Sequence, residues 1–129
     1  MAGGLTNAGC STIAVLITNG ASTGYFSSAS AYLAVGSAST AFAATQTDLQ
    51  EATNKSRKPM QAGYPTVSNQ SMTFRSLWTA SSANFRWNEI GCMNAASGGT
   101  MLFRDVQALG EKPSTQSWQL TMTATVQTD

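Results

Sequence analysis

Two acidic residues lie where their carboxyl groups could carry out acid–base chemistry. Glu89 lies within NFRWNEIGCM (84–93), among aromatic and apolar residues, and Asp105 follows in TMLFRDV (100–106). Two carboxylates held about 5–10 Å apart could hydrolyse a glycosidic bond, one as the acid and the other as the base or nucleophile. If the two segments form neighbouring strands, Glu89 and Asp105 are the one pair of acids that could form such a dyad.

Nearby arginines favour a structural role for Glu89 instead. A buried carboxylate needs a compensating partner, and a guanidinium group can hold it with two parallel hydrogen bonds. Arg86 lies three positions before Glu89, so strand alternation turns it to the opposite face. We therefore predict that Glu89 is a polar pin of the β core, held by Arg75 or Arg104 from a neighbouring strand.

Few residues support any other chemistry. The chain has no histidine, which removes the commonest general base and the commonest zinc ligand. Cys10 and Cys92 form no C-x-x-C motif, and they could pair only if the fold brings their Cα atoms within about 7 Å. We expect two reduced, partly buried thiols. The AASGGT turn lacks the lysine and the spacing of a phosphate-binding loop. We expect no enzyme activity, and no catalytic residue, metal or cofactor.

The composition narrows the choice of partners. Charged residues make up 10% of the 129 residues, the net charge is +1, and serine, threonine and alanine together account for 52 residues. Such a chain creates no strong field toward nucleic acid or a membrane surface, and it contains no apolar run long enough to cross a bilayer. A surface of hydroxyls and alanines suits lasting contacts with other protein. MAGGLTNAGC lacks the pattern of a secretory signal peptide, so we expect a cytoplasmic chain.

The N-terminal segment reads as a helix followed by a loop. In LTNAGCSTIAVLIT (5–18), apolar residues recur at helical spacing, with Thr6 or Asn7 as the N-cap and Asn19-Gly20 as the stop. The β-branched residues of the same segment would also suit a strand. Residues 20–30 are rich in hydroxyls and glycine, which indicates a flexible loop.

The middle of the chain reads as one short strand and one long connection. AYLAVG (31–36) is typical of a buried strand that ends at glycine, and residues 37–66 are predicted as a long loop. One helical turn is expected near residues 47–51, with Thr45 as its cap. The loop also carries a basic cluster, formed by Lys55, Arg57 and Lys58.

Alternating patterns predict strands from residue 66 onward. The expected strands are 71–78, 84–93, 100–106 and 117–126, with a hairpin turn at 95–99. Strict alternation in the second of these places one set of side chains on a common face, namely Phe85, Trp87, Glu89, Gly91 and Met93. The predicted core residues are Trp78, Phe85, Trp87, Trp118, Leu120 and Met122.

These elements predict a mainly β (α+β) domain that spans residues 1–129. We expect an antiparallel β-sandwich-like fold with one short N-terminal helix and long loops, in which residues 1–30 form the helix and an arm and residues 31–126 form the β-rich core. The segments 1–30 and 37–66 are predicted to be arms between subunits. The candidate interface side chains are Tyr25, Phe26, Lys55, Arg57 and Lys58.

Four motifs in this order resemble those of small structural proteins of tailed bacteriophages, of the tail-fibre, collar and small virion types. They are LTNAG (5–9), YLAVGSASTAFAATQTDLQEATNKSRK (32–58), FRWNEIGCMNAASGGTMLFRDV (85–106) and WQLTMTATV (118–126). The resemblance implies that Val35-Gly36 end a strand, that Leu49, Glu51 and Arg57 form a linking segment, and that Trp87, Glu89 and Gly91 mark a core strand. Cys92 and Met93 depart from the large apolar residues that such proteins often carry there.

The resemblance implies a structural protein of the virion, assembled in the host cytoplasm. Because the chain shows no fibre shaft and no coiled coil, our first expectation is a capsid decoration (cement) protein, a homo-oligomer and preferably a trimer, bound to the major capsid protein. The alternative is a tail collar, fibre-adaptor or baseplate component. A glycan-binding or hydrolytic virion protein is the third reading. Neither nucleic acid nor a membrane is an expected partner.

Overall fold

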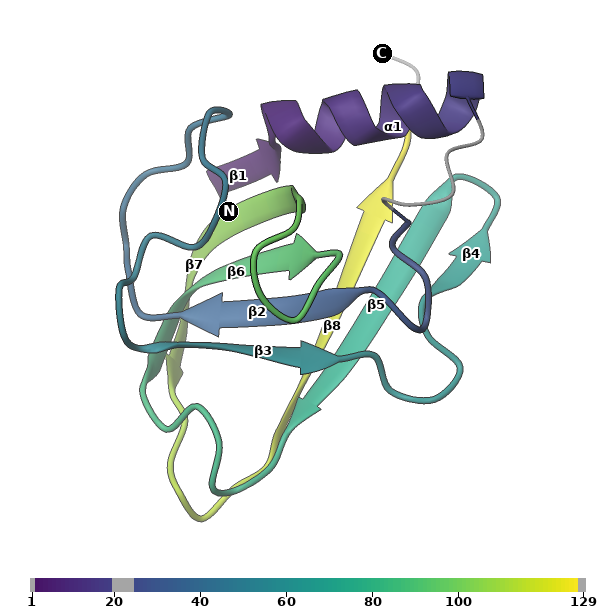
Figure 1. Cartoon of the computed structure of the whole chain (residues 1–129). Helices are drawn as coiled ribbons and strands as arrows, with labels where there is room; N and C mark the ends of the chain where they lie inside the picture. The colour runs from purple at the N-terminus through teal and green to yellow at the C-terminus, as the bar shows by residue number, and fades with distance from the viewer. Residues whose placement is uncertain (1, 20–24, 128–129) are drawn as a thin grey trace.

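Two antiparallel β-sheets and a single α-helix form the part of the chain that the computed structural model describes, residues 2–19 and 25–127 (Figure 1). The elements, in chain order, are β1 (Ala2–Leu5), α1 (Asn7–Asn19), β2 (Tyr32–Gly36), β3 (Lys55–Pro59), β4 (Thr66–Ser68), β5 (Ser71–Trp78), β6 (Arg86–Met93), β7 (Met101–Glu111) and β8 (Trp118–Thr125). The strand order is β1-β7-β6-β2-β3 in the first sheet and β4-β5-β8 in the second. This arrangement confirms the predicted mainly β, sandwich-like fold with one short helix.

The helix α1 begins where Thr6 caps it. The Thr6 hydroxyl accepts a hydrogen bond from the backbone N–H of Gly9 at 2.9 Å, which satisfies one free donor of the first turn, and it donates to the carbonyl of Met101. Gly9 rests directly on β7, because a Cβ atom there would lie 2.5 Å from the Leu102 carbonyl oxygen. Threonine and glycine therefore dock the start of α1 onto the first sheet. The predicted stop at Gly20 lies outside the described residues.

Aromatic side chains join the two sheets. Trp87 of the first sheet packs edge-to-face against Trp78 and Trp118 of the second, with 5.1 Å between ring centroids in each pair. Among the predicted core residues, Trp78, Trp87 and Leu120 are buried. The other three are partly buried and pack against the same cluster, namely Phe85, Trp118 and Met122.

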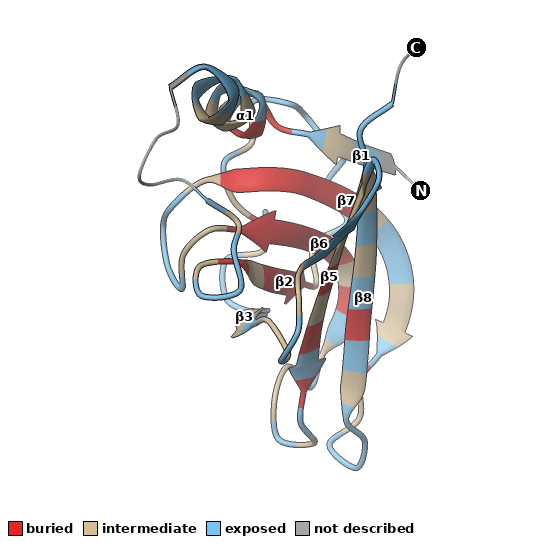
Figure 2. Cartoon of the chain, turned by 90° about the vertical axis from the view of Figure 1, so that its right-hand side faces the viewer, coloured by how far each residue is buried: buried red, intermediate tan, exposed pale blue. Residues whose placement is uncertain are grey.

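Strand β6 does not alternate strictly, so its predicted common face is wrong. Trp87 pairs with Gly110 of β7 but Glu89 pairs with Val106, which marks an irregularity of the β-bulge kind between the two residues. Trp87 consequently packs between the sheets, whereas Glu89 lies on the outer face of the first sheet. Figure 2 shows β6 and β7 buried along much of their length. The second sheet covers one of their faces, and residues 37–54 cover part of the other.

The segment 37–66 is not a loop throughout, as the sequence had predicted. KSRKP (55–59) forms β3, the edge strand beside β2, and residues 66–68 form β4. Residues 47–51 contain bends instead of the expected helical turn. Charge misled the prediction, because lysines and a proline suit an exposed edge strand as well as a loop.

The predicted arms pack against their own chain where the structure describes them. Residues 2–5 form β1, a strand that the sequence analysis missed, and pair with β7. Residues 37–54 lie over the first sheet, where hydrogen bonds from β6 and β7 hold them. Residues 2–5 and 37–54 are therefore integral parts of the first sheet and its covering in their own chain.

Candidate functional site

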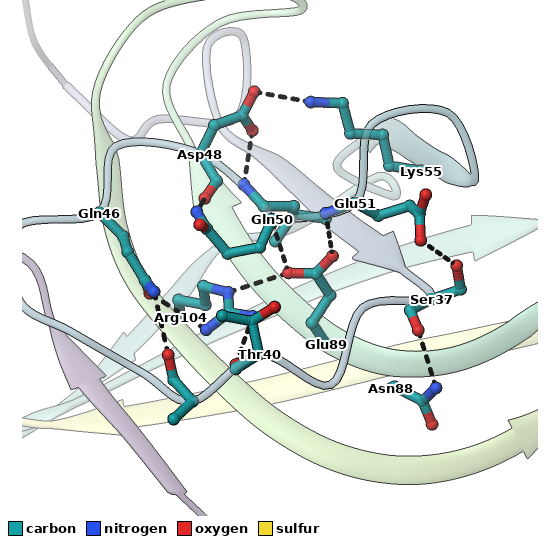
Figure 3. Close-up of polar contacts among 12 residues, drawn as sticks. Ser37, Thr40, Gln46, Asp48, Gln50, Glu51, Lys55, Asn88, Glu89 and Arg104 are labelled. Atoms are coloured by element: carbon teal, nitrogen blue, oxygen red, sulfur yellow. Dashed lines mark hydrogen bonds and ion pairs between the residues drawn. The ribbon is translucent and has the colours of Figure 1, made fainter.

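Glu89 and Arg104 form a fully buried ion pair on the outer face of the first sheet (Figure 3). Both side chains have 0% exposure, and the Arg104 Nε donates to Glu89 Oε1 at 2.9 Å. The contact is a single hydrogen bond, not the predicted fork. The remaining groups of both side chains bind residues 37–54.

Four hydrogen bonds of this pair hold the segment 37–54 in place. Glu89 accepts from the backbone N–H of Gln50 at 2.8 Å and of Glu51 at 3.0 Å. Arg104 donates to the side chain of Gln46 at 3.1 Å and to the Thr40 carbonyl at 2.9 Å. A buried polar group without a hydrogen-bond partner costs free energy, so these bonds stabilise the position of the segment 37–54 on the sheet.

A glycine is required next to this carboxylate. Gly36 pairs with Glu89 across β2 and β6, and a Cβ atom at Gly36 would lie 2.5 Å from Glu89 Oε2. Gly91 pairs with Arg104, and a Cβ atom there would lie 3.1 Å from Leu49. Gly36 and Gly91 therefore leave room for the ion pair and for the segment 37–54 that covers it.

Arg75, the other predicted partner of Glu89, is elsewhere. It lies on β5 in the second sheet, where its Nε donates to the Thr121 hydroxyl at 3.0 Å and its guanidinium lies 4.5 Å from the centre of the Tyr64 ring. This part of the prediction is wrong, because the sequence does not reveal that β5 belongs to a different sheet from β6.

Glu89 and Asp105 do not form a dyad, although β6 and β7 pair as expected. Asp105 pairs with Ile90, so its side chain lies on the face opposite to that of Glu89. Glu89 is enclosed by its partners on the outer face, whereas Asp105 lines a pocket on the inner face. The sheet therefore separates the two carboxyl groups.

The basic cluster is largely engaged within the chain. The Asp48 carboxylate forms ion pairs with Lys55 Nζ at 3.0 Å and with Arg57 Nη2 at 3.3 Å. Arg57 also donates hydrogen bonds to the carbonyls of Ala95 and Gly98. Burial raises the pKa of Asp48, but the hydrogen bonds and charges of these partners lower it further, so the net shift is downward. Of the three cationic side chains predicted for the interface, Lys55 and Arg57 thus form contacts within the chain.

Of the two predicted aromatic contacts, only Tyr25 is exposed. Its carbonyl accepts a hydrogen bond from the Ser30 hydroxyl at 2.6 Å, which closes a local turn. Phe26 instead packs against the core cluster between the sheets. The two cysteines are unpaired, as expected, with Cys10 exposed and Cys92 buried. Burial raises the pKa of the Cys92 thiol well above its ordinary range.

A pocket of about 530 Å³ lies between α1, β1, β7 and the end of β8. Its lining is mainly apolar and includes Ile13, Met72, Phe103 and Met122, but it also contains Asp105, which is 9% exposed. Burial raises the pKa of the Asp105 carboxyl above 3.8, against a smaller lowering by the positive charge of the α-amino group. The sequence analysis assigned Asp105 to a dyad and missed this pocket.

The surface around this pocket carries almost no charge. The chain has no charged residue from position 1 to 47 and none from 113 to 128, and these stretches supply α1, β1 and β8. Ile17 on α1 is 78% exposed and Val126 after β8 is 63% exposed. This uneven distribution of charge was the sequence signal that could have identified the surface.

A buried lysine is a further functional group that the sequence did not reveal. Lys112 is 1% exposed, and its Nζ donates to the Asn84 side chain at 2.8 Å and to the Ala80 carbonyl at 3.3 Å. These contacts close the connection between β5 and β6 against the end of β7.

Comparisons with protein-family models, with curated proteins and with solved structures found no match to this chain. Within the described residues, no helix combines the length and the apolar character needed to cross a lipid bilayer. No cluster of three or more metal-ligating side chains lies in the same part of the chain.

Proposed function

We propose that this protein is a structural component of a tailed-bacteriophage virion, and that it decorates the head by binding the lattice of the major capsid protein. The observation that carries the proposal is the uncharged surface formed by α1, β1 and the end of β8, with Ile17 and Val126 exposed on it. The resemblance of the chain's motifs to those of small virion proteins supplies the particular setting.

Such a surface suits permanent contact with protein for an energetic reason. Burying a charged side chain costs free energy unless a partner compensates it, and this surface has almost none to bury. A standard protein interface buries on the order of 1,600 Å² in total, and its core is depleted of charge. A protein that binds only the assembled shell stabilises that shell by mass action.

The experiment is to place Ile17→Lys in the phage genome and to measure the amount of this protein in purified particles. The lysine must be desolvated at the proposed contact, so incorporation and the heat stability of the heads should both fall. Leu77→Lys is the matched control. Leu77 is also exposed but lies near the end of β5, away from the surface formed by α1, β1 and the end of β8, so this variant should be incorporated normally.

Immunogold labelling of intact particles tests whether the protein is located on the head or on the tail. Gold spread over the head is the expected result, and light scattering of the free protein should give the mass of a trimer. Gold confined to the tail would instead assign the protein to the collar, fibre-adaptor or baseplate, and its absence from the particle would refute the virion role.

A further inference from the structure

Strand β8 is an unprotected sheet edge. It lies at the end of the second sheet, spans eight residues and pairs with β5 in an unbroken register. It contains no charged residue, no proline and no bulge, the features with which natural proteins keep edge strands from pairing.

The other sheet edges have such protection. β3 carries Lys55, Lys58 and Pro59, β4 has three residues, and β1 has four. The contrast indicates that β8 is left open for a purpose, because an exposed edge of this length is otherwise a site of aggregation.

The direction of the free backbone groups on β8 follows from one hydrogen bond. The N–H of Val126 donates to the Gln70 carbonyl at 2.9 Å, which continues the ladder between β8 and β5. Since N–H groups alternate in direction along a strand, those of the even-numbered residues point to β5. The N–H and C=O groups of Thr121, Thr123 and Thr125 therefore point to the free edge.

Two hollows follow this edge. The pocket of about 530 Å³ lies beside residues 122–127, between β8 and the opposite elements β1 and α1, and a second hollow of about 440 Å³ separates Trp118–Leu120 from Leu109 of β7. In Figure 2 the second half of β7 curves behind β8, and Leu109 of β7 and residues 118–120 of β8 line the second hollow together. The first hollow is an apolar groove along residues 122–127 of β8 and its end, floored by Met72, Phe103 and Met122.

Asp105 gives the groove one polar feature. Asp105 is 9% exposed and lines the groove, and the positive charge of the α-amino group acts on its carboxyl group. An occupant that brings a lysine or arginine into the groove would form an ion pair with this carboxylate.

We propose that the groove along β8 binds an extended segment of a protein partner by strand addition. The segment pairs its backbone with Thr121, Thr123 and Thr125, places apolar side chains at alternate positions into the groove, and brings a lysine or arginine to Asp105. Strand addition would be the way in which the protein makes the assembly contact proposed above. It rests on that proposed function only because both assume that the partner is a protein.

The test is selection of a random peptide library against the full chain, followed by binding measurements on variants. Enriched peptides should carry apolar residues at alternate positions and one basic residue. Thr123→Pro removes an N–H that points to the free edge and leaves the bonds to β5, so binding should weaken by about tenfold or more. Thr123→Val keeps that N–H and should bind like the original chain.

A second variant separates the charge from the backbone contact. Asp105→Asn should remove the preference for a basic residue while peptides still bind, and circular dichroism confirms that each variant is folded. The proposal is overturned if no peptide is enriched, or if Thr123→Pro binds as tightly as Thr123→Val. Failure of virion incorporation with intact peptide binding would refute the phage role alone.

Discussion

Replacing Glu89 with glutamine should cost a large share of the stability of this protein. The carboxylate is fully buried, receives Arg104, and accepts two backbone N–H groups of the segment 37–54. A glutamine of the same shape has one acceptor oxygen, and its NH₂ group must face one of these donors. Arg104 then remains buried without a counter-charge.

The magnitude follows from the burial of the pair. Removing one partner of a buried ion pair costs about 3–5 kcal/mol, out of a total stability of about 5–15 kcal/mol for a domain. For a chain of this size, that loss lowers Tm by roughly 10–25 °C. Urea unfolding followed by far-UV circular dichroism, with thermal melts, measures both quantities.

Glu111→Gln is the matched control, because Glu111 forms an exposed pair with Arg86 at 4.0 Å. Exposed pairs contribute at most about 1 kcal/mol, so this variant should lie close to the original protein. Limited proteolysis should also cut the segment 37–54 faster in Glu89→Gln, because the segment loses its anchor. Equal stabilities for the two variants, with no change in cleavage, would show that the buried pair does not hold the fold.

Three more substitutions test other parts of the structure. Gly36→Ala should destabilise the protein by about 1–3 kcal/mol in urea titrations, because a Cβ atom there meets Glu89; Gly4→Ala, where a Cβ atom would lie 3.7 Å from the Phe42 ring, is the control. Thr6→Ala should cost about 1 kcal/mol by removing the cap of α1, and a melt that is unchanged contradicts the capping role. Asp105→Asn should raise stability at neutral pH. Because burial raises the pKa of Asp105, the native state holds its proton more tightly than the unfolded state, and stability is lost as pH rises through the raised pKa. Asparagine removes that loss, so melts of the two proteins should converge in acid and separate near pH 7; parallel curves would contradict the reasoning.

Alternation and capping residues predicted the elements whose local sequence agrees with the fold. β5 spans the predicted 71–78, and β8 falls within the predicted 117–126 because its threonines and apolar residues alternate without interruption. The helix was predicted within two residues of its observed start because Thr6 is a strong cap.

Long-range geometry decided the features that the sequence could not give. The choice between Arg75 and Arg104 depends on which sheet each strand joins, and neither strand carries that information. The irregularity near Glu89 reverses the face on which Trp87 lies, and no local residue signals it. Glu89 and Asp105 lie on opposite faces of the same sheet. Glu89 therefore forms the buried ion pair, whereas Asp105 lines the groove.

The tryptophan cluster makes the chain its own optical probe. All three tryptophans belong to one edge-to-face stack that spans both sheets. Near-ultraviolet dichroism and intrinsic fluorescence therefore report the docking of one sheet on the other. The segment 37–54 contains no tryptophan, so its release from Glu89 should leave these signals in place while proteolysis detects it. Loss of the pin and separation of the sheets can thus be followed as two distinct events in the same sample.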